Sequence, residues 1–170
     1  MTLDRFVDGD HLWLLSTGTG LAPFLSILQD FEVWQRFERI VLVYSVRTED
    51  ELAYRELLDE ILTREYVAEF AHKFTFVPVV TRAEVSGCLN ARITDLLTSG
   101  ELERCVDLPM EAERSRVLLC GNPEMVERFT CATPFIYVRV KQVAVNGCEL
   151  REQLSKLFRL AVHSGFQCTA

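Results

Sequence analysis

One stretch near the start of the chain, residues 12–28, most constrains what these 170 residues can fold into. The short apolar run over 12–15 predicts a fully buried strand, which the polar segment Thr17-Gly-Thr-Gly20 ends. Apolar side chains then recur at helical spacing, at Leu21, Phe24, Leu25 and Leu28. Pro23 suits the first turn of such a helix, where its missing N–H costs nothing. The pattern therefore predicts a strand, a glycine turn and a helix.

The glycine turn has a chemical consequence. Gly18 and Gly20 allow backbone dihedrals and a close approach that a side chain would forbid. Such a turn directs backbone N–H groups and the positive end of the following helix at one point. We therefore expect an anion site at residues 17–20.

Composition narrows the class of protein and of partner. A hydrophobic content of 49% and a charged content of 25% are typical of a folded protein, and the length allows one domain with a sizeable core. The net charge of −7 argues against nucleic acid as the main partner, so any phosphate site must be local. No apolar run approaches the roughly 20 residues that cross a bilayer, and the first residues do not resemble a signal peptide. We expect a cytoplasmic protein with no membrane partner.

The cysteines and histidines give no sign of a metal centre. The six cysteines are scattered without a CxxC pair, so free thiols are expected. Their spacing also differs from the plant-type iron–sulfur pattern, and the three histidines share no ligand spacing with acids or cysteines. We expect no metal.

Three further apolar runs predict buried strands, over residues 40–45, 74–80 and 116–120. Pro78 in the second of these indicates an edge position or a distorted end. Thr48-Glu-Asp-Glu51 has the form of a capping box before a long helix whose apolar face runs to Leu62. Shorter helices are expected at 93–97 and after the turn at 121–123, with a polar connector up to Glu113. This alternation predicts an α/β fold: a doubly wound, mostly parallel sheet with helices on both faces.

In such sheets, ligands bind outside the carboxyl ends of the strands, near the point where strand order reverses. Arg47 follows the second predicted strand, where NAD-binding folds usually carry an acid for the ribose hydroxyls. An arginine there favours a 2′-phosphate, through charge-assisted hydrogen bonds. Without the upstream glycine turn, Arg47 would be interpreted as a solvated charge flanking a helix.

Several strings of this sequence resemble the pyridine-nucleotide domain of ferredoxin/flavodoxin–NADP(+) reductases. They are Thr17-Gly-Thr-Gly-Leu-Ala-Pro23, Val-Val-Thr-Arg82, Leu-Asn-Ala-Arg92-Ile and Cys120-Gly-Asn-Pro123. The resemblance covers about three-quarters of the chain and stops near Glu127. The resemblance implies an NADP-binding fold of the ferredoxin reductase type.

The resemblance also implies roles for individual residues. Thr17 and Cys120 would line the nicotinamide pocket and position the ring, without acting as acid, base or nucleophile. The pyrophosphate and nicotinamide region would lie on the two turns, and three arginines would hold the adenosine 2′-phosphate. The expected cofactor-binding residues are Thr17, Gly18, Thr19, Gly20, Gly121, Asn122, Pro123, Arg47, Arg82 and Arg92.

The activity implied is that of an oxidoreductase. NADPH would pass a hydride to FAD, which exchanges single electrons with ferredoxin or flavodoxin, and the cofactors would carry the redox chemistry. Two alternatives remain: a non-catalytic NADP-binding module, and a reductase component for another acceptor such as an oxygenase.

The ends of the chain depart from the family pattern. We expect residues 1–11 to be the remnant of a linker from a missing FAD domain, 12–128 to be the NADP-binding domain, and 129–170 to be a divergent tail of unknown conformation. The tail holds 2 acidic and 5 basic residues, against 23 and 13 before it, and lacks the family's aromatic ending. A change of reading frame near residue 128 would explain this. The chain alone is expected to be inactive without an FAD domain.

Overall fold

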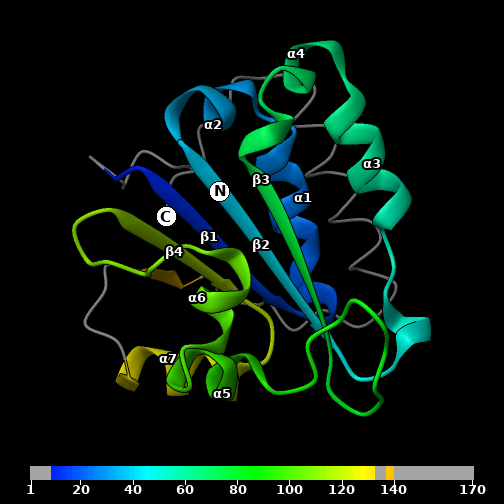
Figure 1. Cartoon of the computed structure of the whole chain (residues 1–170), viewed down its shortest axis with the longest axis vertical. Coiled ribbons are helices and arrows are strands. Elements are labelled where there is room, and N and C mark those ends of the chain that lie inside the picture. Colours follow the sequence, from blue (N-terminus) through cyan, green and yellow to red (C-terminus); the bar gives the residue numbers. More distant parts are fainter. Residues whose placement is uncertain (1–8, 133–136, 140–170) are drawn as a thin grey trace.

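The core of the molecule is a five-stranded parallel sheet, seen in a computed structural model that describes residues 9–132 and 137–139 (Figure 1). The strand order is β3-β2-β1-β4-β5, and every neighbouring pair is parallel. The strands are β1 (His11–Thr17), β2 (Arg39–Val46), β3 (Phe74–Val80), β4 (Ser115–Cys120) and β5 (Tyr137–Arg139).

Helices cover both faces of the sheet (Figure 1). One face carries α1 (Ala22–Leu28), α2 (Phe31–Arg36), α3 (Arg55–Thr63) and α4 (Glu65–Ala68). The other carries α5 (Ile93–Thr98), α6 (Glu101–Val106) and α7 (Pro123–Ala132). Short 3-10 turns are η2 (Gly18–Leu21), η3 (Glu49–Glu51) and η4 (Ala71–Lys73). The predicted doubly wound α/β fold is therefore confirmed.

The central strands are apolar throughout because both of their faces are buried. In β1, Leu12 and Leu14 pack into the core beneath α1–α4, whereas Trp13 and Leu15 pack into the core beneath α5–α7. All four side chains have no exposed surface. Continuous apolar runs of this kind are what a two-sided parallel sheet requires.

The order of the strands reverses between β1 and β4. The chain builds outward from β1 to β2 and β3 and then returns to β4 on the other side of β1. Ser16 at the end of β1 lies opposite Cys120 at the end of β4. The turns that follow these two strands are therefore neighbours at the switch point, where open α/β sheets bind ligands.

The position of Pro78 agrees with its prediction, since β3 is an edge strand. Leu89 pairs with its outer side: Val80 N–H donates to the Leu89 carbonyl at 2.9 Å, and Leu89 N–H donates to the Pro78 carbonyl at 3.0 Å. Pro78 can occupy this place because a missing N–H on the outer side of an edge strand breaks no ladder bond.

The predicted capping box is wrong. Thr48 makes no capping side-chain hydrogen bond within the described residues, and residues 49–51 form only the turn η3. The long helix starts later, at Arg55, after Tyr54 adopts a left-handed conformation with φ +70°. The helices α2, α4 and α6 were not predicted, whereas those at 93–98 and from 123 were. Of the tail expected over residues 129–170, the structure describes only residues 129–132 and 137–139.

No helix in the described part of the chain is long and apolar enough to span a membrane.

Candidate nucleotide-binding site

Two turns meet at the switch point of the sheet. The first joins β1 to η2, and the second joins β4 to α7. They are tied by one hydrogen bond, in which the backbone N–H of Asn122 donates to Thr17 Oγ1 at 2.7 Å. Beneath them, the buried Ser16 hydroxyl donates to the Val43 carbonyl at 3.0 Å and links β1 to β2. Thr17 is thus fixed by its neighbour across the sheet, and the structure brings the predicted residues 17–20 and 120–123 together.

Glycine is required where the two turns touch. A Cβ at Gly20 would overlap the backbone of Cys120 and Gly121. A Cβ at Gly121 would overlap the backbone and side chain of Thr17, and the φ of Gly121 is +134°. Both glycines therefore allow a close approach of two backbones, as the sequence predicted for Gly20.

Gly18 serves a different purpose. Its φ is +52°, and no atom of the described residues, its two chain neighbours aside, lies within 4 Å of where a Cβ would stand. Gly18 and Thr19 are exposed, as are Asn122 and Pro123 on the second turn. The outer side of the paired turns is thus open and lined by backbone and short polar groups, which suits a pyrophosphate approaching the start of η2 and α1.

Cys120 is the last residue of β4, directly before the second turn, and its side chain belongs to the core beneath α1–α4. Its side chain is only 3% exposed, and burial raises the pKa of its thiol to about 11. The thiol is therefore neutral at physiological pH and is a poor nucleophile. It can pack against a ring and shape a pocket, which is the positioning role that the resemblance implies.

At the other end of the site, Arg47 and Arg82 follow β2 and β3. The backbone N–H of Arg82 donates to the Arg47 carbonyl at 2.9 Å, so the two residues lie side by side. Thr81 strengthens this junction, because both its N–H and its hydroxyl donate to the Val46 carbonyl, at 3.0 and 3.1 Å. The structure thus brings the ends of β2 and β3 together at this pair of residues.

Arg92 directly precedes α5, at the far end of the loop over residues 81–92. Within residues 9–132 and 137–139, no hydrogen bond joins Arg92 to Arg47 or Arg82. All three side chains are exposed, and none of the guanidinium groups has an ion-pair partner in the described part of the chain. They are available to a phosphate.

Sequence reasoning missed the roles of Glu51 and Tyr44. The Glu51 carboxylate accepts a hydrogen bond from the backbone N–H of Arg47 at 2.9 Å, and the Tyr44 hydroxyl donates to the Glu51 carbonyl at 3.2 Å. Glu51 therefore closes the loop after β2 and presents Arg47. The only sequence signal is an acid four residues after the arginine, which was assigned to helix capping.

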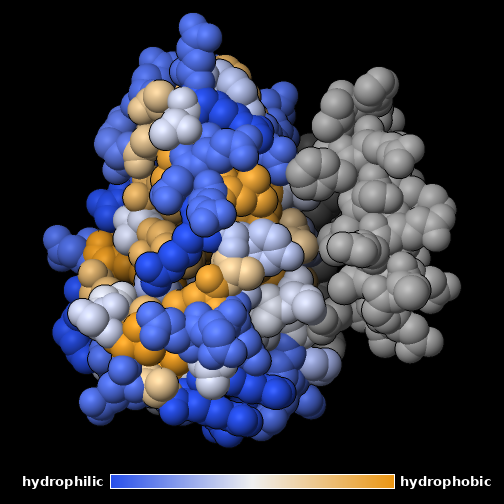
Figure 2. All heavy atoms as spheres, turned by 90° about the vertical axis from the view of Figure 1, so that its right-hand side faces the viewer, coloured by the Kyte–Doolittle hydropathy of each residue, from blue (hydrophilic) through white to orange (hydrophobic). Residues whose placement is uncertain are grey.

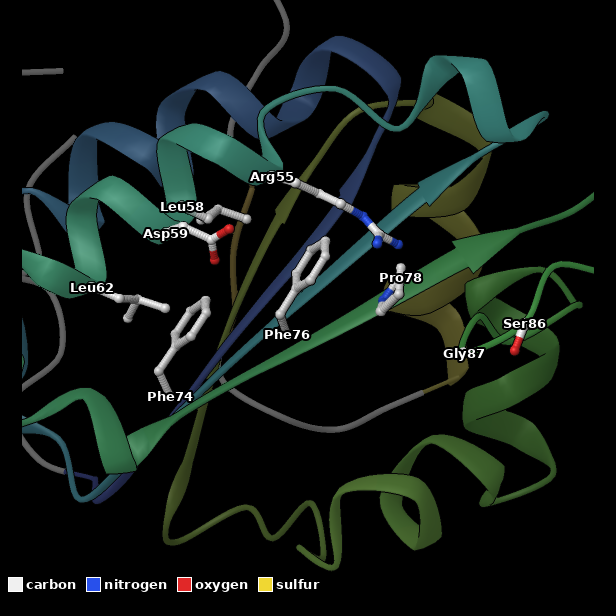
Figure 3. A pocket seen from close by; sticks show the side chains of 9 residues that line it. All are labelled: Arg55, Leu58, Asp59, Leu62, Phe74, Phe76, Pro78, Ser86 and Gly87. Carbon is white, nitrogen blue, oxygen red and sulfur yellow. The ribbon is translucent and has the colours of Figure 1, made fainter.

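A hollow of about 380 Å³ lies away from the switch point, between α3, the edge strand β3 and the loop after it (Figure 3). Figure 2 faces the side of the molecule on which α3 lies in Figure 1, and it shows apolar surface in the middle of a mostly hydrophilic face. The hollow was not predicted. Its lining residues are Arg55, Leu58, Asp59, Leu62, Phe74, Phe76, Pro78, Ser86 and Gly87.

Curated proteins match most of this chain in sequence. A ferredoxin–NADP reductase of Azotobacter vinelandii is 43% identical over 122 residues, which cover 70% of this chain and 46% of that protein. A flavodoxin/ferredoxin–NADP reductase of Escherichia coli K12 is 42% identical over 124 residues, covering 73% and 48%. The chain thus spans about half the length of the curated relatives it matches.

A solved structure agrees with the sequence matches. The ferredoxin NADP+ reductase of Neisseria gonorrhoeae with bound FAD and NADP superposes with a TM-score of 0.69 and 34% identity, over 81% of this chain and 59% of that one. The family model of the oxidoreductase NAD-binding domain matches residues 14–131, which include both glycine turns and all three arginines. The chain therefore belongs to the oxidoreductase NAD-binding domain family.

Proposed function

We propose that residues 12–128 form the NADP-binding domain of a ferredoxin/flavodoxin–NADP(+) reductase. The observation that carries this proposal is the pair Arg47 and Arg82, joined through their backbones at the ends of β2 and β3 with both guanidinium groups free of ion pairs in the described residues. A phosphate with two negative charges would be held there by charge-assisted hydrogen bonds. NAD has no phosphate at this position.

The two ends of the site would bind different parts of the nucleotide. Thr17, Gly18, Thr19 and Gly20 would hold the pyrophosphate and the nicotinamide region, with the second turn facing them. That second turn consists of Gly121, Asn122 and Pro123. Arg92, at the start of α5, would join Arg47 and Arg82 on the 2′-phosphate.

The chain's own contribution to the reaction would be orientation. When bound, NADPH would supply a hydride for the FAD of the whole reductase. Thr17, held by Asn122, and Cys120, neutral and buried, would fix the plane of the nicotinamide ring. Neither residue would transfer a proton. Hydride transfer requires donor and acceptor roughly 3–3.5 Å apart, so a ring held in one orientation lowers the barrier.

The remaining features of the whole enzyme are proposed from its relatives. Ferredoxin or flavodoxin, which the names of the curated relatives give as partners of those proteins, would exchange electrons with the flavin. The enzyme would act in the cytoplasm.

Calorimetric titration with NADP+ and NAD+ tests the proposal. We expect NADP+ to bind at least about tenfold more tightly, because a 2′-phosphate adds hydrogen bonds between charged groups that NAD+ cannot make. Equal affinities for the two nucleotides would refute the assignment of the arginines. An absence of binding by either would refute the nucleotide site itself.

A further inference from the structure

The loop over residues 81–92, which carries two of the three proposed phosphate ligands, wraps around the end of the edge strand. Val85 and Cys88 pack against the core beneath α1–α4. Leu89 and Ala91 pack against the core on the opposite face of the sheet. The loop therefore packs on both faces of the sheet at the edge formed by β3.

Among the described residues, the backbone of this loop is hydrogen-bonded to the rest of the molecule at its two ends and not in its middle. Arg82 is bonded to Arg47, and Leu89 is bonded to Pro78 and Val80. Between these anchors, the turn at 85–88 closes on itself through a bond from Cys88 N–H to the Val85 carbonyl at 3.1 Å. Gly87 in this turn has φ +77° with open space around it. The hollow described above separates the turn from α3.

One side chain crosses that hollow. Arg55 extends from the first turn of α3 over Phe76 and towards Pro78 and the loop (Figure 3). Its Nη2 donates to Cys88 Sγ at 3.9 Å. Among the described residues, this is the one side-chain hydrogen bond that joins α3 to the loop. Arg55 forms no ion pair with Asp59, one turn further along the helix, in the described part of the structure.

We propose that Arg55 is a positioning residue for the 2′-phosphate site, because its contact with Cys88 keeps the loop over residues 81–92 seated on the edge strand. This inference rests on the proposed function, since it assigns the loop to NADP. Arg55 acts on the loop and leaves the phosphate to Arg82 and Arg92. Its loss is therefore expected to weaken the binding of ligands that carry a 2′-phosphate and to spare NAD+.

The first experiment needs no nucleotide. In the full chain, Arg55→Gln is compared with the parent protein by amide hydrogen exchange of Val80 and Leu89, whose N–H groups bond across the edge of β3. We expect exchange at both amides to accelerate at least about threefold, while Val43 in the middle of the sheet is unchanged. Unchanged exchange at Val80 and Leu89 would overturn the proposal, whatever the nucleotide affinities are.

The second experiment is a double-mutant cycle on NADP+ affinity with Arg55→Gln and Cys88→Ala. We expect Arg55→Gln to weaken NADP+ binding about three- to tenfold and NAD+ binding less than twofold, and to have no further effect in the Cys88→Ala background. Arg104→Gln on α6 is the matched control for loss of one exposed positive charge, and NADP+ affinity should be unchanged in it.

The outcomes separate the two proposals. An equal loss of NADP+ affinity in both Cys88 backgrounds would show that Arg55 acts through its charge, and the positioning role would be overturned. The same holds if NADP+ affinity is unchanged in Arg55→Gln while Arg82→Ala weakens it. If the parent protein does not prefer NADP+ to NAD+, the proposed function fails, and the role of Arg55 in binding fails with it.

Discussion

The two ends of the proposed site are built in opposite ways. At the switch point, the two glycine turns are packed directly on each other, so that neither Gly20 nor Gly121 has room for a Cβ. At the ends of β2 and β3, a backbone hydrogen bond joins Arg47 and Arg82, and their side chains are exposed. One end is shaped by close packing, whereas the other is defined by the placement of charge.

This difference has consequences for how each end tolerates change. A packed end is formed before the ligand arrives, so substitutions there alter the stability of the fold. An exposed arginine makes few contacts in the free protein, so its removal alters affinity alone. Substitutions at the packed end are therefore expected to lower the free energy of unfolding, whereas substitutions of the arginines are expected to change nucleotide affinity.

The largest effect is expected at Gly121. Gly121→Ala would force a methyl group into Thr17 at a φ of +134°, and we expect a loss of about 3 kcal/mol in the free energy of unfolding. Gly18→Ala is the matched control, because it meets only a left-handed φ of +52° in open space and should lose about 1 kcal/mol. Urea denaturation measures both. Equal losses would contradict close packing of the two turns.

A smaller effect, confined to binding, is expected at Arg47. Arg47→Ala keeps the backbone N–H that bonds to Glu51 but removes the guanidinium group. NADP+ binding should weaken by about 1.5–3 kcal/mol, the range for hydrogen bonds to charged groups, while NAD+ binding barely changes. Calorimetry of the variant beside Arg104→Ala separates this contact from a general loss of charge. A comparable loss of NAD+ affinity would place Arg47 elsewhere in the site.

The reactivities of two thiols compare the two ends without a ligand: Cys120 lies at the packed end, and Cys88 lies in the loop over residues 81–92. At pH 8, a thiol with a pKa of about 11 is ionised in roughly one molecule in a thousand, so Cys120 should react with iodoacetamide at least about tenfold more slowly than the half-buried Cys88. Labelling of Cys120 should accelerate about tenfold per pH unit up to pH 10, as its thiolate accumulates. Peptide mass spectrometry follows each site. Rapid labelling of Cys120 at pH 8 would mean that the packed end opens.

Sequence patterns predicted the packed end well. Apolar runs buried on both faces, as in β1, leave little freedom in where a strand lies, and the glycines at 18 and 20 locate the turn. The same reasoning missed α2, although Asp30 caps it by accepting from Glu32 N–H at 3.0 Å. With only six residues and two buried side chains, α2 has too weak a helical periodicity to detect.

The exposed end was predicted only in outline. The family resemblance assigned Arg47 and Arg82 to one phosphate site, but the strand order that makes them neighbours was not predicted. The loop that presents Arg47 was not predicted either, because Thr48 and Glu51 match a capping box whose geometry the chain does not adopt. The actual partners of Glu51 are a backbone N–H and the hydroxyl of Tyr44, and such contacts depend on the folded loop and not on local spacing.

The central claim is that one nucleotide is held by two separate ends of one site. Amide NMR shifts of the labelled chain, recorded with nicotinamide mononucleotide and with 2′-phospho-AMP, test it directly. The account predicts that the mononucleotide shifts amides of residues 17–20, 121 and 122, and that 2′-phospho-AMP shifts those of Arg47, Arg82 and Arg92, with AMP much weaker. Shifts of the same amides by both fragments, or equal effects of AMP and 2′-phospho-AMP, would contradict it.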